Sequence, residues 1–204
     1  MEIFVLSDLH GDEALIEGLR RVDTDLIVII GDFITRTPIS YVMKILDAVP
    51  NLLAIHGNCD PPQVVDMLDE RGVSLHKKRV DFGQFNFVGY GGSGPTPFGT
   101  PSEKKEEEIL ADLEGLEIDS KTVLFTHAPP KGYFDMTPKG NAGSTAIREI
   151  IEKKKPYMNV CGHIHEHEGK AMLGDTIIVK VGSASRGRAA ILDLENGGVN
   201  FISI

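Results

Sequence analysis

Short apolar runs alternate with amphipathic stretches through the first half of the chain. Crossover helices between such runs predict parallel strands joined in the right-handed sense. Ligands of parallel sheets collect at the carboxyl ends of the strands, and Asp8, Asp32 and Asn58 follow the three apolar runs. The predicted strands are residues 3–6, 26–30 and 52–55, and the predicted helices are residues 13–21 and 39–48.

The second half of the chain predicts a different sheet. It begins with a hairpin over residues 78–90, and a loop rich in glycine and proline follows. Thr100 is the expected N-cap of the next helix, with Pro101 at its first position and Glu103 completing a capping box. The other expected elements are a helix near 64–71, a strand at 123–126, a helix over 144–154, a strand at 158–161, and a tail of strands with turns at 174–175 and 196–198.

Length and composition fit a single compact domain over residues 1–204, in which 41% of positions are hydrophobic and 25% are charged. No apolar run approaches the roughly 20 residues that span a bilayer. The first residues lack the basic region and cleavage site of a secretory signal, so we expect a cytoplasmic protein. Cys59 and Cys161 are the two cysteines, too few for a disulfide framework, which favours a reducing compartment.

The charge balance restricts the class of partner. A net charge of −9 argues against a broad grip on nucleic acid, because such binding normally uses a basic face. Basic runs at 77–79 and 153–155 are typical of solvated surfaces. A small anionic substrate remains compatible with this composition, and edges of the hairpin sheet could support a homodimer.

Carboxylate, imidazole and amide side chains lie in five short segments that come after apolar runs. Oxygen and nitrogen donors in this mixture suit manganese, iron, zinc, nickel or cobalt better than magnesium or calcium alone. Each motif is weak alone, whereas Gly-His-x-His after an apolar run is the most specific, since both imidazoles turn back to one site. The candidate metal ligands are Asp8, His10, Asp32, Asn58, His127, His163 and His165.

The order of these motifs resembles that of the calcineurin-like metallophosphoesterase superfamily over nearly the whole chain. Gly-Gly-Ser-Gly-Pro-Thr-Pro-Phe-Gly at 91–99 and Thr-His-Ala-Pro-Pro at 126–130 look like stretches of its Icc-related phosphoesterase subgroup. The resemblance implies an α/β fold, a four-layer α/β/β/α sandwich with two mixed β-sheets. It also implies a dinuclear metal centre at the strand ends.

The resemblance further implies a role for each ligand candidate. Asp32 would bridge two divalent ions, and a bridging hydroxide would attack phosphorus in line. The two ions, two carboxylates and the hydroxide leave a formal charge of about +1, which attracts a phosphate ester. The first ion would be held by Asp8, His10 and His165, and the second by Asn58, His127 and His163; manganese is the first expectation for both.

One position departs from the family pattern. Most members carry histidine after the motif asparagine, but here the residue is Cys59, followed by Asp60. A neutral thiol is a poor general acid, and Asp60 has no histidine to orient, so the roles of both residues stay open; Cys59 could simply pack. The expected catalytic residues are Asp32, Asn58, His127, Cys59 and Asp60.

Family members with cysteine at this position resemble phosphodiesterases more than broad monoesterases. We therefore expect hydrolysis of small phosphodiesters, with cyclic nucleotides as a plausible class. Alternatives are a phosphomonoesterase and a metal-binding scaffold for protein contacts.

Six further residues carry expectations of their own. His56 is expected to be a hydrogen-bonded structural residue, His76 to face solvent, and His167 to lie in an exposed turn. Arg36 is expected on the surface, Cys161 in the core, and Phe98 either stacked on substrate or in a surface loop.

Overall fold

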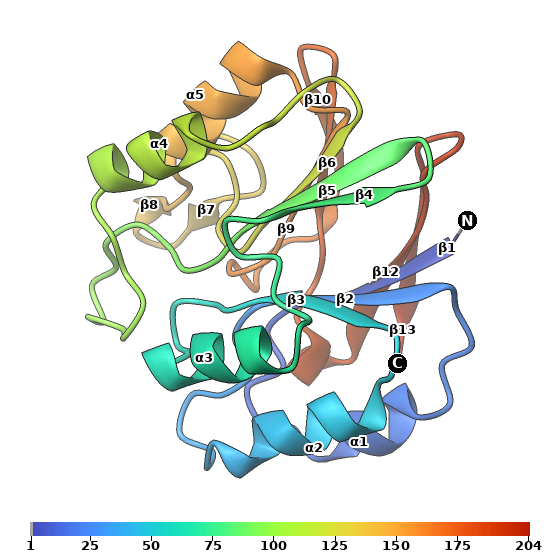
Figure 1. Cartoon of the computed structure of the whole chain (residues 1–204). Coiled ribbons are helices and arrows are strands. Elements are labelled where there is room, and N and C mark those ends of the chain that lie inside the picture. Colours follow the sequence, from blue (N-terminus) through green and yellow to red (C-terminus); the bar gives the residue numbers. More distant parts are fainter. Residues whose placement is uncertain (1) are drawn as a thin grey trace.

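The computed structural model describes residues 2–204, in which two mixed β-sheets face each other (Figure 1). The first sheet comprises β1 (Glu2–Leu6), β2 (Leu26–Ile30), β3 (Leu52–Ile55), β12 (Arg188–Asp193) and β13 (Gly198–Ser203). Its strand order is β13-β12-β1-β2-β3. Strands β1, β2 and β3 are parallel, as their crossover helices predict, and β12 pairs antiparallel with both β1 and β13.

The second sheet begins with the predicted hairpin and has the order β10-β11-β9-β6-β5-β4. Its four central strands are parallel, and the two edge strands are antiparallel to their neighbours. The strands are β4 (Arg79–Phe82), β5 (Phe85–Tyr90), β6 (Thr122–Thr126), β9 (Met158–Cys161), β10 (Gly169–Leu173) and β11 (Thr176–Lys180). A separate ribbon pairs β7 (Met136–Thr137) with β8 (Gly140–Asn141).

Helices cover the outer face of each sheet, which confirms the expected four-layer sandwich (Figure 1). On the first sheet lie α1 (Ala14–Leu19), α2 (Ser40–Ala48) and α3 (Pro62–Glu70). On the second lie α4 (Glu106–Glu114) and α5 (Thr145–Lys154), and a 3₁₀ turn, Ala184–Arg186, precedes β12.

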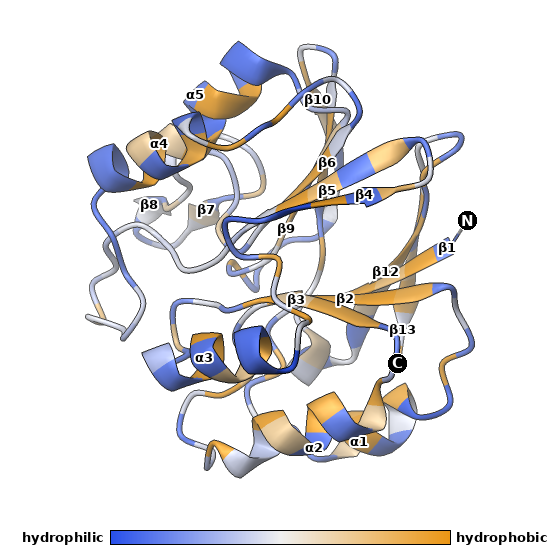
Figure 2. Cartoon of the chain, in the orientation of Figure 1, coloured by the Kyte–Doolittle hydropathy of each residue, from blue (hydrophilic) through white to orange (hydrophobic). Residues whose placement is uncertain are grey.

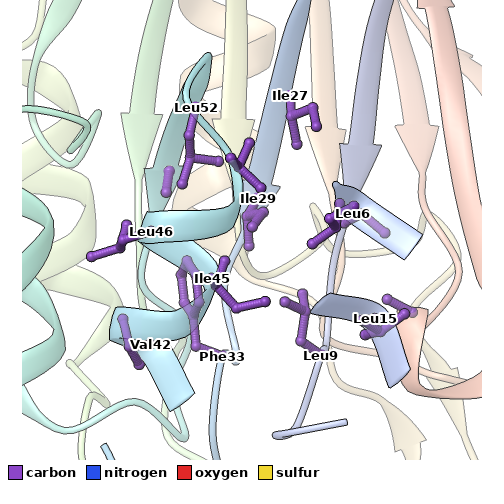
Figure 3. Close-up of a cluster of buried hydrophobic side chains, with 14 of the residues drawn as sticks. Leu6, Leu9, Leu15, Ile27, Ile29, Phe33, Val42, Ile45, Leu46 and Leu52 are labelled. Atoms are coloured by element: carbon purple, nitrogen blue, oxygen red, sulfur yellow. The ribbon is translucent and has the colours of Figure 1, made fainter. Parts of the chain in front are cut away.

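Three hydrophobic clusters join the four layers. The cluster under α1 and α2 includes Leu6, Ile29 and Ile45 (Figure 3). A second cluster lies between the sheets, and the third joins the second sheet to α4 and α5. Figure 2 shows that hydrophobic residues concentrate on the strands, while the helices also carry hydrophilic residues. Burial of apolar area in these clusters is the main favourable contribution to folding.

The helix expected to begin at Thr100 begins instead at Glu106, so that prediction was wrong. The Thr100 N–H does donate to the Glu103 carboxylate, as a capping box requires. However, the backbone around these two residues is already hydrogen-bonded: Ser102 N–H donates to the Asn58 carbonyl, and Ser93 forms an isolated β-bridge with Glu103. These long-range hydrogen bonds use backbone groups that a helix would need, and Lys105 becomes the N-cap.

Across residues 2–204, no helix combines the length and the apolar character needed to cross a membrane. The carboxyl ends of β1, β2 and β3 lie at the same edge of the first sheet, because these strands are parallel. The carboxyl ends of β6 and β9 do the same in the second sheet. Loops that leave these two edges form the site described next.

Candidate metal centre

All seven candidate ligands follow a strand end directly or within a few residues. The first sheet supplies Asp8 after β1, with His10 in the same loop, Asp32 after β2 and Asn58 after β3. The second sheet supplies His127 after β6 and the pair His163 and His165 after β9. The backbone joins the two groups as well, because His163 N–H donates to Asp8 Oδ2 at 3.0 Å.

Three side chains converge in a first group: Asp8, His10 and His165. His165 Nε2 lies 3.1 Å from Asp8 Oδ1 and 3.1 Å from His10 Nε2. The His10 Nε2 atom is 3.9 Å from the same Asp8 oxygen. Two imidazole nitrogens and a carboxylate oxygen therefore face one point, which is the arrangement that a divalent transition metal requires.

A second group contains Asp32, His127 and His163, whose ligand atoms all lie within 4.8 Å of one another. Asn58 adds an amide oxygen, with Oδ1 3.0 Å from His127 Nε2. The His127 Nδ1–H donates to the Ile30 carbonyl at 2.8 Å, so Nε2 is the ring nitrogen that faces the group. This group thus offers three kinds of metal-ligating atom.

Asp32 lies between the two groups and contacts both. Its Oδ2 is 3.9 Å from His10 Nε2, and its Oδ1 is 3.5 Å from His127 Nε2. One carboxylate therefore directs a different oxygen toward each group. The residue is almost wholly buried, at 3% exposure, so water cannot substitute freely for either contact.

The backbone adopts sparsely populated conformations at four of these residues. Asp8 has φ 59°, His10 has φ 49°, Asp32 has φ 54° and His163 has φ 72°. Left-handed backbone is costly for residues that carry a Cβ, and it accumulates where side chains must be aimed at a functional centre. The candidate ligands include four of the seven such residues other than glycine found in residues 2–204.

Several side chains that orient the ligands were missed by sequence reasoning. Ser7 Oγ donates to Asp8 Oδ2 at 2.5 Å, and Thr35 Oγ1 lies 2.6 Å from His10 Nδ1. Ser183 Oγ donates to the Asp8 carbonyl from a segment 175 residues later. Only Ser7 stands beside a motif residue in the sequence, so spacing gave no signal for the other two.

The charges of the two groups are strongly coupled. Burial opposes ionisation of Asp8, but the His165 hydrogen bond and the His127 charge outweigh it and hold its pKa well below the usual range. Burial likewise opposes protonation of His127, yet the Asp32 and Asp8 carboxylates raise its pKa to about 9. For His163, burial dominates and lowers the pKa to about 4, which keeps its imidazole neutral. A proton on His127 therefore offsets part of the negative charge of Asp8 and Asp32, a charge that a bound cation would also offset.

Cys59 lies against the first group, where its Sγ is within 4.8 Å of ligand atoms of His10 and Asp32. Its backbone N–H donates to Asp32 Oδ1 at 2.8 Å. Burial and the Asp32 carboxylate raise the pKa of the Cys59 thiol. Its proton is therefore held tightly, which fits the expectation of a poor general acid.

Asp60 is fully buried beneath the site, where it holds backbone together. Its carboxylate accepts hydrogen bonds from Gly57 N–H at 2.8 Å, Ile34 N–H at 3.0 Å and Phe33 N–H at 3.2 Å. Burial and the Asp32 charge raise its pKa to about 7, against the effect of these three donors. This clamp between the loops that carry Asp32 and Asn58 was not predicted from the sequence.

We expect Asp60→Ala to lower the free energy of unfolding by about 2–4 kcal/mol, because each buried N–H left without an acceptor costs roughly 1–3 kcal/mol. Urea unfolding followed by circular dichroism measures the loss. The matched control is Asp66→Ala on the exposed face of α3, for which a change within about 0.5 kcal/mol is expected. Equal stability of the two variants would show that the clamp contributes little.

The remaining predictions for single residues have mixed outcomes. His76 does not face solvent: it is half-buried, accepts a hydrogen bond from Gly91 N–H and packs edge-on against His56. His56 is buried, but its Nδ1 has no hydrogen-bond partner among residues 2–204, so the hydrogen bond expected for this residue is absent at that nitrogen. The predicted placement of three others is confirmed: His167 and Arg36 are exposed, and Cys161 is buried core. Phe98 lies in its loop at 79% exposure, which is compatible with both of its expected roles.

Comparison with known proteins agrees with this geometry. A calcineurin-like phosphoesterase superfamily domain matches residues 1–197. Protein MJ1162 of Methanocaldococcus jannaschii is 34% identical over 194 residues, which cover 88% of this chain and 87% of that protein. Among solved structures, an archaeal phosphodiesterase superposes with a TM-score of 0.61 at 14% identity, covering all of both chains. A dimetal phosphatase from Danio rerio superposes with a TM-score of 0.59 at 11% identity, covering 100% of this chain and 98% of that one.

The fold and the clustered ligands define a metal-dependent hydrolase of phosphate esters. The chain belongs to the calcineurin-like phosphoesterase superfamily. The two solved structures are too distant in sequence to indicate more than the shared fold.

Proposed function

We propose that this phosphoesterase is a phosphodiesterase with a two-metal centre, acting on small phosphodiesters, with cyclic nucleotides as a candidate class. The observation that carries the proposal is the position of Asp32, whose two oxygens are directed toward separate ligand groups. Asp8, His10 and His165 would hold one ion, Asn58, His127 and His163 the other, and Asp32 would bridge them. Manganese is the first candidate, with iron, zinc, nickel and cobalt as alternatives.

The donor set fits two divalent ions. Two imidazole nitrogens, those of His10 and His165, lie 3.1 Å apart beside a carboxylate oxygen. One cation can bind the lone pairs of both nitrogens and the oxygen together, which a single shared proton cannot do. When bound, such a pair of ions supplies a water acidified near neutral pH and positive charge for the phosphoryl oxygens. The whole chain, residues 1–204, is proposed to act as one domain.

The residues of the chain divide the remaining tasks. His127 is fixed by the Ile30 carbonyl and Asp8 by Ser7, so both reach the site in a preset orientation. Cys59 keeps its proton and gives little help to a leaving alkoxide. Esters with good leaving groups, which need no protonation of the leaving oxygen, are therefore favoured.

The test removes metal from the protein, restores manganese, and compares hydrolysis of bis-p-nitrophenyl phosphate with that of p-nitrophenyl phosphate. Metal-dependent preference for the diester supports the proposal. Preference for the monoester would instead make the protein a phosphatase and would require another acid. No turnover of either substrate would favour a metal-binding scaffold for protein contacts.

The position of Cys59 gives a second expectation. Cys59→His is expected to increase kcat for diesters with poor leaving groups by about tenfold or more, because an imidazole can protonate the leaving oxygen. The measurement is the dependence of kcat on leaving-group pKa across a series of aryl and alkyl diesters. Cys59→Ser controls for loss of the sulfur. Unchanged or lower turnover in Cys59→His would argue that this position only packs.

A further inference from the structure

Asn58 is the only carboxamide among the seven candidate ligands, and a loop residue far along the chain holds it. Its Nδ2 donates to Thr100 Oγ1 at 2.8 Å, while its Oδ1 lies 3.0 Å from His127 Nε2. A carboxylate ligand can rotate by half a turn and still present oxygen. A carboxamide cannot, since the same rotation would present an NH₂ group to the cation. Asn58 therefore needs an orienting partner more than Asp8 or Asp32 does.

The single hydroxyl proton of Thr100 determines which atoms donate and which accept in its hydrogen bonds with Glu103 and Asn58. A threonine hydroxyl has one proton, and the Thr100 hydroxyl donates it to Glu103 Oε1 at 2.5 Å. The Thr100 N–H donates to the same oxygen at 2.7 Å. Only lone pairs of Thr100 Oγ1 are then left for Asn58, so the carboxamide must donate there and must direct Oδ1 toward His127.

Glu103 is well suited to hold Thr100 in this state. Its carboxylate also accepts from Thr96 N–H at 3.0 Å and from the Thr96 hydroxyl at 2.5 Å. Burial opposes ionisation, but the hydrogen bonds from Thr100 and Thr96 outweigh it and lower the pKa of Glu103 to about 2. At neutral pH Glu103 accepts hydrogen bonds and donates none, so the Thr100 hydroxyl does not turn toward Asn58.

We propose that Glu103, acting through Thr100, is a positioning residue that orients the Asn58 carboxamide with its oxygen toward the second ion. The inference rests on the proposed two-metal function. It assigns a role to the loop between β5 and α4, which contributes none of the seven candidate ligands. Loss of the orientation would weaken the second ion, held by Asn58, His127 and His163, and would leave the first ion unchanged.

Other hydrogen bonds hold the loop between β5 and α4, so the contact from Glu103 through Thr100 to Asn58 can be removed while the loop stays in place. Ser102 N–H donates to the Asn58 carbonyl at 3.0 Å, and Ser102 Oγ donates to the Asp60 carbonyl at 2.6 Å. Ser93 pairs with the backbone on both sides of Glu103. These contacts involve no Thr100 hydroxyl, so a variant that lacks only this hydroxyl keeps the loop in place.

The experiment compares Thr100→Val, which keeps the shape and removes the hydroxyl, with Thr100→Ser, which retains the hydroxyl. Thr96→Val is the matched control, because the Thr96 hydroxyl donates to the same Glu103 oxygen and makes no hydrogen bond to Asn58. Calorimetric titration of metal-stripped protein with manganese measures the two affinities. We expect Thr100→Val to weaken the second ion by about 10- to 100-fold, with Thr100→Ser and Thr96→Val near wild type.

Glu103→Gln is expected to weaken the second ion in the same direction, because a glutamine amide can donate to Thr100 and free its hydroxyl proton for Asn58. Wild-type affinity in both Thr100→Val and Glu103→Gln would overturn the inference. An equal loss in Thr96→Val would also overturn it, since loop integrity alone would then be responsible. Unchanged binding in Glu103→Gln alone would overturn it as well, because the proposal assigns the orientation of Thr100 to Glu103.

A second measurement separates this inference from the proposed function. In metal-free protein, the Asn58 side-chain NH₂ resonances report the hydrogen bond to Thr100 by NMR. We expect them to shift in Thr100→Val and to stay in Thr100→Ser and Thr96→Val; unchanged resonances in Thr100→Val would overturn the orientation. If wild-type protein bound fewer than two ions, the two-metal function would fall, and with it the effect on the second ion, while the NMR comparison would still decide the orientation of Asn58.

Discussion

Asp32→Asn is expected to lower kcat for phosphodiester hydrolysis by at least about 1,000-fold and to leave at most one tightly bound ion per chain. Its two oxygens are directed toward His10 on one side and His127 on the other. A carboxamide keeps the shape but replaces one oxygen by an NH₂ group, which a cation repels. Loss of about 4 kcal/mol of transition-state stabilisation corresponds to this factor, and loss of a metal can account for that amount.

Steady-state kinetics with bis-p-nitrophenyl phosphate and elemental analysis after dialysis measure the two effects together. Asp66→Asn, an exposed carboxylate on α3, is the matched control for the loss of one negative charge. It should retain wild-type kinetics and metal content. An Asp32→Asn protein that keeps two ions and more than a tenth of the wild-type rate would rule out Asp32 as the bridge.

The placement of the candidate ligands was predictable because each follows a buried strand. Parallel strands bring their carboxyl ends to one edge, so Asp8, Asp32 and Asn58 had to meet wherever the crossover pattern was right. The second sheet brings His127 and His163 to the same place for the same reason. Periodicity and strand order thus determine the position of most of the site.

The contacts that orient these ligands were not predictable in the same way. Thr100 reaches Asn58 across 42 residues, and it does so only because the loop after β5 folds back onto the end of β3. Because the loop takes this path, α4 begins only at Glu106. The start of the loop also covers His76, whose imidazole accepts a hydrogen bond from Gly91 N–H although the sequence predicts that it faces solvent. A local pattern carries no information on the path of such a loop, so its hydrogen bonds override capping and exposure preferences.

Left-handed backbone at non-glycine residues is a further feature that residue propensity opposes. Asp8, His10 and Asp32 all adopt it, although glycine is the residue that favours this conformation. The surrounding contacts impose it: Asp8 N–H and His10 N–H donate to the carbonyls of Gly31 and Asp32. The strain is thus located where side chains must be aimed, and it is invisible to a pattern of hydrophobic and polar positions.

Gly57→Ala is expected to lower kcat by about 100-fold or more, although the substitution adds a single methyl group outside the ligand set. A Cβ at this position would overlap Asp32 Oδ1 and the Asp32 backbone nitrogen. Gly57 N–H also donates to Asp60 Oδ2 at 2.8 Å, so the residue is confined between two carboxylates. Asp32 must therefore move, and displacement of a catalytic group by about 1 Å costs on the order of 100-fold in rate.

Gly18→Ala in α1 is the matched control, because a Cβ there meets no atom within 4 Å. Alanine at this helical position should leave the kinetics unchanged and raise the unfolding midpoint slightly, since alanine is the better helix former. Measured together, kcat, metal content and the urea midpoint separate displacement of Asp32 from general unfolding. Gly57→Ala protein with wild-type rate and two bound ions would mean that the loop after β3 yields without moving Asp32, and the close packing between Gly57 and Asp32 would then not be what sets the geometry of the centre.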